Sequence, residues 1–126
     1  MKKNLIVGVI ILVMGCQQNT KQQLEKDAKL MATLECEARQ LKEYRFKVAN
    51  DIRFMEDSLM KTGKALTATQ SKEIDSIRNE LTLRTGGLAD KITKTMDSLF
   101  TVQYKTTEQR HDFDVATEQM LQEVCK

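Results

Sequence analysis

Histidine meets carboxylates at one place in the sequence, His111-Asp112-Phe113-Asp114. A metal site or an acid–base pair needs side chains that converge on one point at defined distances. Consecutive residues of a helix point in different directions, so these polar side chains do not converge without help from elsewhere in the chain. Acids near the start of a helix have a simpler role, because they complement its positive end. We therefore predict no metal ligand or catalytic group here.

Other patterns with catalytic chemistry are missing from the sequence. Gly86-Gly87 lacks the following lysine and the preceding strand of a phosphate-binding loop, and no serine or threonine stands in a nucleophile-elbow pattern. Cys36 and Cys125 lack the CxxC spacing of a redox pair. The sequence predicts a protein that is not an enzyme and that binds no cofactor.

The first sixteen residues, MKKNLIVGVIILVMGC, carry the most specific pattern in the chain. Lys2 and Lys3 precede an apolar run from Leu5 to Met14, and Gly15 stands directly before Cys16. The run is too short to span a bilayer as a stable helix, so it is typical of a secretory signal. An uncleaved signal anchor and a plain secretory leader are the alternatives.

The ending of this leader, LVMGC, resembles the lipobox of bacterial lipoproteins. In that class the cysteine sulfur receives a diacylglycerol, the leader is cut before the cysteine, and the new amino group is usually acylated. The resemblance implies a signal peptide at residues 1–15, lipidation of Cys16, and anchoring in the bacterial cell envelope. A polar tether at residues 16–22 and a helical domain at residues 23–126 would follow. The resemblance stops at Cys16, and the helical domain resembles no family known to us.

The residues after Cys16 bear on which membrane holds the lipid. In diderm bacteria with the common sorting system, an aspartate directly after the lipidated cysteine tends to retain a lipoprotein at the inner membrane. Gln17 stands at that position, and the tract QQNTK lacks the acid-rich start of some surface-export signals. The resemblance therefore implies the outer membrane, facing the periplasm.

Lipidation of Cys16 leaves Cys36 and Cys125 as an even pair in an exported protein, where a disulfide can form and persist. We expect an intramolecular Cys36–Cys125 disulfide, with free thiols or an intermolecular bridge as alternatives. The bridge would close a loop of 89 residues and stabilise the domain by about 4–5 kcal/mol in the chain-entropy model.

Removal of the leader also changes the charge balance. The full chain has 20 Lys and Arg against 18 Asp and Glu, and Lys2 and Lys3 leave with the signal peptide. The mature chain is then neutral, which removes the electrostatic motive for nucleic-acid binding.

The mature chain has no proline and few glycines, which favours helix. From about Thr20 to Met60, apolar residues recur at alternating spacings of three and four, with Arg45 as a polar intruder. This pattern predicts one long helix with a seam that faces a partner helix. Arg45 would pair with an acid or extend its head group to water. The seam residues are Met31, Leu34, Ala38, Leu41, Arg45, Val48, Ile52, Met55 and Leu59.

Cys36, Phe46 and Phe54 fall nearly opposite this seam at about 100° per residue. Apolar groups on two sides of a helix favour neighbours on two sides, in a bundle or a dimer. We therefore predict an interaction facet that includes Phe46 and Phe54, although single exposed aromatic residues are also ordinary.

Turn and capping signals divide the rest of the chain. Gly63 is placed to cap the end of the first helix, and the pairs Thr20/Gln23, Thr67/Gln70 and Thr106/Gln109 each fit a capping box. Gly86-Gly87 favours a break, and counting helical rise between the cysteines mildly favours a turn there. The sequence predicts an all-α bundle of three or four helices on one long N-terminal helix, with an elongated helical hairpin as the alternative.

These features indicate a lipid-anchored envelope protein that acts as a non-enzymatic interaction or adaptor module. Its partners would be the membrane, through the lipid, and an envelope protein or a second copy. The alternative is a periplasmic carrier or sensor of a lipid or other apolar ligand, with a cavity lined by methionine and leucine.

Overall fold

The computed structural model describes the backbone of residues 5–126 and the side chains of residues 20–126. It contains three helices, α1 (Leu5–Lys61), α2 (Ala68–Val102) and α3 (Thr107–Val124), and no strand in the described backbone. The prediction of an all-α fold on a long N-terminal helix is confirmed. The predicted signal peptide (residues 1–15) and the predicted lipidation site, Cys16, lie outside the residues whose side chains are described.

Local signals in the sequence set the ends of the helices. Gly63 has φ 67°, its N–H donates to the Met60 carbonyl (3.0 Å), and the Lys64 N–H donates to the Leu59 carbonyl (2.9 Å). Glycine adopts this left-handed conformation without a Cβ clash, so the predicted glycine cap is confirmed.

The capping boxes predicted for the second and third helices are both formed. The Gln70 and Gln109 backbone N–H groups donate to the hydroxyls of Thr67 and Thr106, each at 3.2 Å. Each glutamine side chain accepts the threonine N–H in return. At Thr20, where a third box was predicted, the backbone is already helical on both sides, so this threonine does not begin a helix. Residues 20–22, the described end of the predicted tether, are helical and exposed.

The chain divides into two compact units. The first, which we call the hairpin unit, is the continuous stretch of residues 34–95 and contains most of α1 and α2. The second, which we call the terminal unit, combines the described residues 20–33 with residues 96–126 and includes α3.

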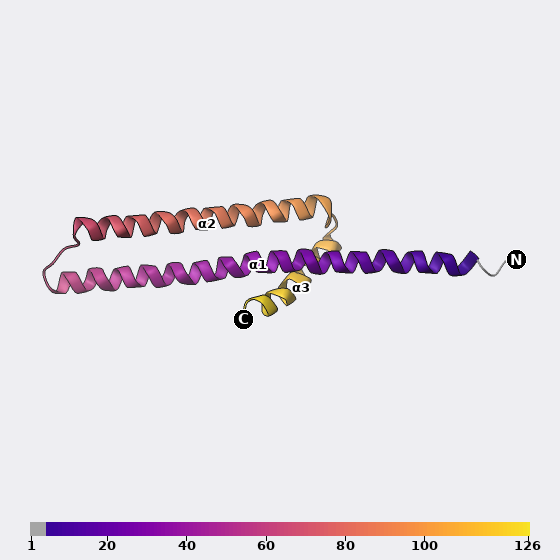
Figure 1. The fold of residues 1–126 in the computed structure, drawn as a ribbon, viewed down its shortest axis with the longest axis horizontal. Helices are drawn as coiled ribbons and strands as arrows, with labels where there is room; N and C mark the ends of the chain where they lie inside the picture. Colours follow the sequence, from indigo (N-terminus) through magenta and orange to yellow (C-terminus); the bar gives the residue numbers. More distant parts are fainter. Residues whose placement is uncertain (1–4) are drawn as a thin grey trace. The chain divides into compact units, whose positions relative to one another are not determined.

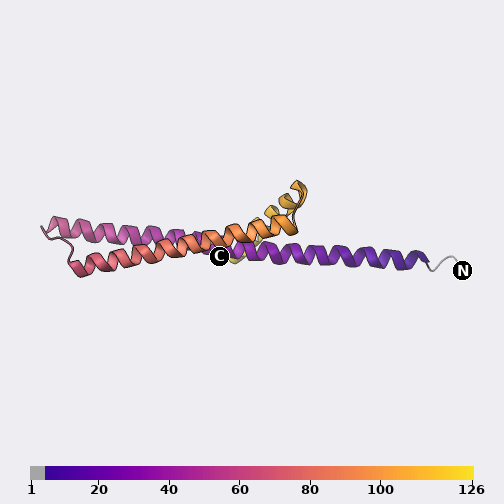
Figure 2. The same ribbon diagram turned by 90° about the horizontal axis from the view of Figure 1, so that it is seen from above.

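In the hairpin unit, α2 runs back alongside α1 (Figure 1), and the two helices cross at a shallow angle in the view of Figure 2. Such packing is typical of a seam with three–four spacing. Leu34, Leu41 and Ile52 of α1 and Ile74 and Leu81 of α2 are buried. The other apolar seam positions of α1 in this unit are half-buried. The predicted seam is confirmed.

Arg45, the polar intruder, is exposed. Its Nη1 donates to Thr85 Oγ1 of α2 at 3.4 Å, and it forms no ion pair with a described side chain. The guanidinium therefore lies at the edge of the seam, in contact with water.

The expectation of a turn at Gly86-Gly87 is wrong, because α2 is continuous from Ala68 to Val102. Each glycine costs a helix about 1 kcal/mol relative to alanine. Leu81, buried, and Leu88 and Ile92, both half-buried, lie on the α2 face that packs on α1. Burying such side chains outweighs the cost of the glycines. The estimate from helical rise favoured the turn only mildly, by a few residues that the loops can absorb, and the disulfide forms without the turn.

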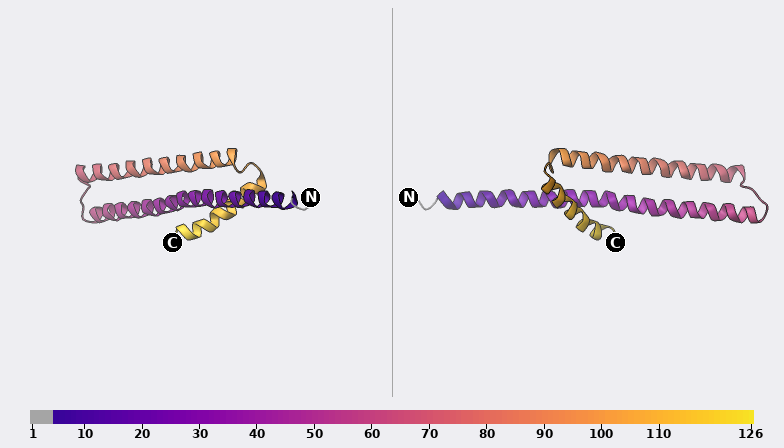
Figure 3. Two further views of the ribbon diagram at one scale, coloured as in Figure 1. Left: turned by 45° about the vertical axis from the view of Figure 1, so that its right-hand side comes forward. Right: turned by 180° about the vertical axis from the view of Figure 1, so that it is seen from behind.

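In the terminal unit, α3 crosses α1 obliquely (Figure 3). Phe113 and Leu121 of α3 are 1% and 2% exposed, and Met31 of α1 is 2% exposed. The Phe113 ring stacks on Tyr104 (centroids 4.8 Å apart) and meets the edge of Phe100 (5.8 Å). These aromatic contacts form part of the unit's core.

A polar pair is buried beside these rings. The Tyr104 hydroxyl donates to Asp27 Oδ2 (3.0 Å), and Gln23 Nε2 donates to Asp27 Oδ1 (2.9 Å). Burial, and then the hydrogen bond to Asp27 and its charge, raises the pKa of the Tyr104 phenol well above its usual value. Arg110 Nε donates to the Tyr104 carbonyl at 3.0 Å and fixes the turn before α3.

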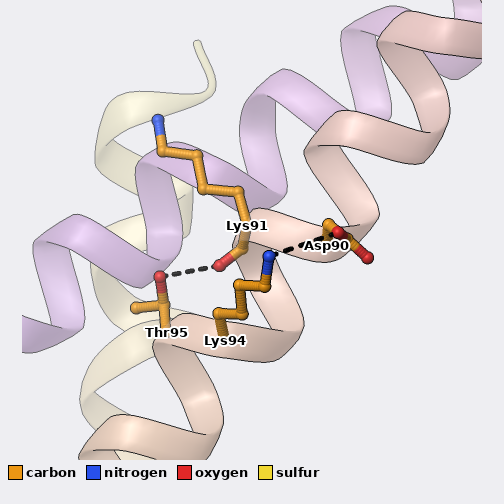
Figure 4. Close-up of polar contacts among 4 residues, drawn as sticks. All are labelled: Asp90, Lys91, Lys94 and Thr95. Carbon is orange, nitrogen blue, oxygen red and sulfur yellow. Dashed lines mark hydrogen bonds and ion pairs between the residues drawn. The ribbon is translucent and has the colours of Figure 1, made fainter.

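The exposed face of α2 carries contacts between residues three or four positions apart. Figure 4 shows two of them: Lys94 Nζ pairs with Asp90 Oδ2 at 3.4 Å, and the Thr95 hydroxyl donates to the Lys91 carbonyl at 2.8 Å. The Asp90 and Lys94 side chains are more than two-thirds exposed. Such pairs contribute only about 0.3–0.5 kcal/mol each, so this face is mainly a solvated surface.

Candidate interaction surface

A groove runs between α1 and α2 on one side of the hairpin unit. It encloses about 830 Å³, and we call it the basic groove. Its lining is contributed by both helices and consists of Lys42, Arg45, Phe46, Val48, Ala49, Ile52, Arg53, Glu56, Arg78, Leu81 and Thr82.

The spacing of the α1 residues explains how the groove is built. Val48 and Ile52 belong to the seam, and together with Leu81 of α2 they supply an apolar floor. Lys42, Ala49 and Arg53 are spaced by seven and four positions, so they share the side of α1 next to the seam. Ala49 and Thr82 are small and exposed, and this leaves the space between the two helices open.

The charge of the lining is strongly one-sided. Four cations, from Lys42, Arg45, Arg53 and Arg78, face a single acid, Glu56. Arg78 lies 3.9 Å from Asp75, an exposed pair that neutralises it only weakly. The other three cations form no ion pair with any side chain that the structure describes. The groove is therefore a region of positive potential over an apolar floor.

The hollow continues along the same side as a smaller pocket of about 140 Å³. Lys42 and Arg45 line both hollows, and Ala38, Ala89 and Ile92 carry the floor further. The combined surface follows α1 from residue 38 to residue 56, about 27 Å at the rise of an α-helix.

The other side of the hairpin unit is different. Its hollow encloses about 470 Å³ and is lined by Glu37, Gln40, Leu41, Tyr44, Arg84 and Leu88. One acid balances one cation there. The excess of positive charge thus belongs to one side of the hairpin, although Lys and Arg exceed Asp and Glu by only two in the whole sequence.

The two phenylalanines of the predicted facet are strongly exposed, Phe46 at 62% and Phe54 at 64%. Lys42 Nζ lies 6.0 Å from the centroid of the Phe46 ring, and Arg53 Cζ lies 5.6 Å from that of Phe54. Phe46 forms part of the groove lining, and Phe54 does not. Cys36, which shares their side of the helical wheel, is only 5% exposed. The structure therefore brings Phe46, but not Phe54 or Cys36, to the groove.

The structure also describes the predicted disulfide and the acidic residues around His111. Cys36 and Cys125 are both disulfide-bonded, in agreement with the expected bridge. His111, Asp112 and Asp114 are exposed on α3. No group of three or more potential metal ligands gathers among the described residues.

No helix in the described part of the chain is long and apolar enough to cross a membrane.

Of the four cations of the groove, the sequence pattern singles out Arg45 alone, as the polar position in the seam. Lys42 and Arg53 are interspersed with acids along the chain, and the small net charge of the whole sequence, +2, does not reveal them. A helical projection of charge, as well as of apolar residues, would have shown these cations on the same side of α1. The position of Arg78 beside these cations could not be predicted without the register between α1 and α2.

Comparison of the chain with protein-family models, with curated proteins and with solved structures finds no significant match.

Proposed function

We propose that this chain is a lipid-anchored protein of the bacterial cell envelope that acts as a non-enzymatic helical interaction module. The lipobox-like ending at Cys16 supports the anchor. The observation that carries the interaction role is the basic groove, where an apolar floor lies open beside an exposed Phe46. Exposed apolar surface rimmed by polar groups is typical of protein interaction sites.

The carrier alternative receives less support from the same hollow. That hypothesis expects a cavity lined by methionine and leucine, whereas the basic groove contains no methionine, one leucine and four cations. An apolar ligand would meet charged side chains along much of this lining, at a cost in desolvation.

The anchor is tested by replacing the proposed lipidation site. In phase partitioning with a detergent that separates on warming, the wild-type protein should enter the detergent phase. The Cys16→Ser variant should enter the aqueous phase or remain unprocessed. Equal partitioning of the two proteins would contradict lipid anchoring through Cys16.

The interaction role is tested by purifying the tagged, full-length protein from its own membranes in mild detergent. A stoichiometric envelope protein should co-purify with the wild type and be lost when Phe46 and Phe54 are both changed to serine. Leu83→Ser is the matched control, because Leu83 is 76% exposed and lines none of the hollows described above. Recovery of the protein alone, in every variant, would contradict the proposed role.

A further inference from the structure

We propose that the basic groove binds an acidic amphipathic α-helix of a partner protein, laid lengthwise between α1 and α2. This inference rests on the interaction role proposed above and specifies the chemistry of the partner.

The shape of the groove favours a helix as its occupant. Two packed helices leave a trough on each side of their seam, and a third helix fills such a trough by placing its ridges into the groove between them. Small side chains line much of the floor, so a third helix can approach closely. These residues are Ala38, Ala49, Thr82 and Ala89. The length of about 27 Å accommodates about five helical turns.

The apolar floor requires an apolar stripe on that helix. Val48, Ile52 and Leu81 line the groove, and Val48 is still half-buried after α1 and α2 have packed together. Covering this remaining surface would stabilise the complex in proportion to the apolar area removed from water. The occupant is therefore amphipathic.

The cations require that the flanks of the stripe be acidic. Lys42 and Arg53 stand on the α1 side of the trough and Arg78 on the α2 side, so both flanks of a bound helix would meet positive charge. Electrostatic complementarity of this kind selects partners and speeds encounter. A second copy that presented the same groove would bring like charges together. A flat bilayer surface does not fit a concave trough between two helices.

Site-specific photo-crosslinking in the full-length protein, in its own membranes, tests the proposal. A photoreactive phenylalanine derivative replaces Ala49 on α1 or Thr82 on α2, both exposed and both in the groove. Asn50 and Asn79 are the matched control positions. Asn50 directly follows Ala49 and Asn79 directly follows Arg78, both asparagines are exposed, and neither lines the groove. Mass spectrometry identifies the linked segment.

We expect Ala49 and Thr82, but not the two asparagine positions, to link to one segment of another envelope protein. That segment should contain apolar residues at helical spacing flanked by Asp and Glu. A link to a basic segment, to lipid or to a second copy would overturn the proposal. Links at Asn50 or Asn79 with none in the groove would also overturn it, yet would leave the interaction role intact. The absence of a crosslink at every position, together with failed co-purification, would contradict both the groove proposal and the proposed interaction role.

Charge reversal supplies a second, independent readout. The double variant Lys42→Glu with Arg53→Glu should lower the yield of the groove crosslink by about tenfold or more, since it juxtaposes like charges. Arg39→Glu with Lys47→Glu changes the net charge of α1 by the same amount at exposed positions outside the groove, and should lower the yield by less than about twofold. Equal loss in the two double variants, with unchanged helical circular dichroism, would contradict recognition through the groove.

Discussion

The hydroxyl of Tyr104 donates a hydrogen bond to the carboxylate of Asp27, 77 positions earlier in the chain, and both residues are less than one-tenth exposed. Among the described side chains, removing the hydroxyl leaves the buried Asp27 carboxylate with its one remaining hydrogen bond, from Gln23. Tyr104→Phe should therefore lower the free energy of unfolding by about 1–3 kcal/mol, measured by urea denaturation. Tyr44→Phe, at a residue 49% exposed, should change it by less than about 0.5 kcal/mol. Equal effects would contradict a structural role for the buried pair.

The same pair makes stability sensitive to alkaline pH. The pKa of Tyr104 is raised above 10.0 by burial first and by Asp27 second, so the unfolded chain loses this proton before the folded chain does. Its contribution is therefore fully present below about pH 10. Above that, the free energy of unfolding falls by at most about 1.4 kcal/mol per pH unit. Denaturation across this range should show a steeper fall for the wild type than for Tyr104→Phe. Identical slopes would contradict the assignment.

Replacing Gly63, Gly86 or Gly87 with alanine should change the stability of the protein in a direction that depends on the position. A Cβ at Gly86 or Gly87 meets no atom within 4 Å, so Gly86→Ala and Gly87→Ala should each stabilise α2 by about 0.5–1 kcal/mol. Gly63 has φ 67°, and Gly63→Ala should destabilise by about 1–2 kcal/mol because a Cβ clashes in that conformation. Thermal unfolding of the three single variants checks the signs. Destabilisation by both Gly86→Ala and Gly87→Ala would indicate that α2 needs flexibility there.

Loss of the disulfide should cost more than any of these changes. Cys36 and Cys125 are disulfide-bonded and stand 89 positions apart, so replacing both with alanine should lower the free energy of unfolding by about 4–5 kcal/mol in the chain-entropy model. The wild type should also migrate faster on gels without reductant than with it, and the double variant should not. A disulfide-linked dimer on the gel would instead favour an intermolecular bridge.

Much of the fold could be predicted because it depends on short-range signals. The alternation from Leu34 to Leu59 identifies a buried seam without knowledge of its partner, and the pairs Thr67/Gln70 and Thr106/Gln109 mark helix starts within four residues. Such features are properties of one helix or one turn, so the sequence contains all the information that they require.

The features that could not be predicted depend on packing between distant segments. The continuity of α2 at Gly86-Gly87 depends on the burial of neighbouring side chains against α1, which overrides local propensity. Asp27 looks like a solvated acid until Tyr104 is placed beside it. The excess of cations in the basic groove likewise depends on the register that brings Arg78 next to α1.

The division into a continuous hairpin unit and a discontinuous terminal unit has a kinetic consequence. The two helical segments of the hairpin unit are joined by the short connection between Lys61 and Ala68, so closing them costs little chain entropy. The terminal unit must unite residues 20–33 with residues 96–126 across the whole of the hairpin. Once the α1–α2 pair has formed, Ala38 and Ile92 line the same hollow of the hairpin unit, so the loop that remains to be closed between the two segments is effectively shorter. We therefore expect assembly to start with the α1–α2 pair and the aromatic core around Phe113 to form afterwards.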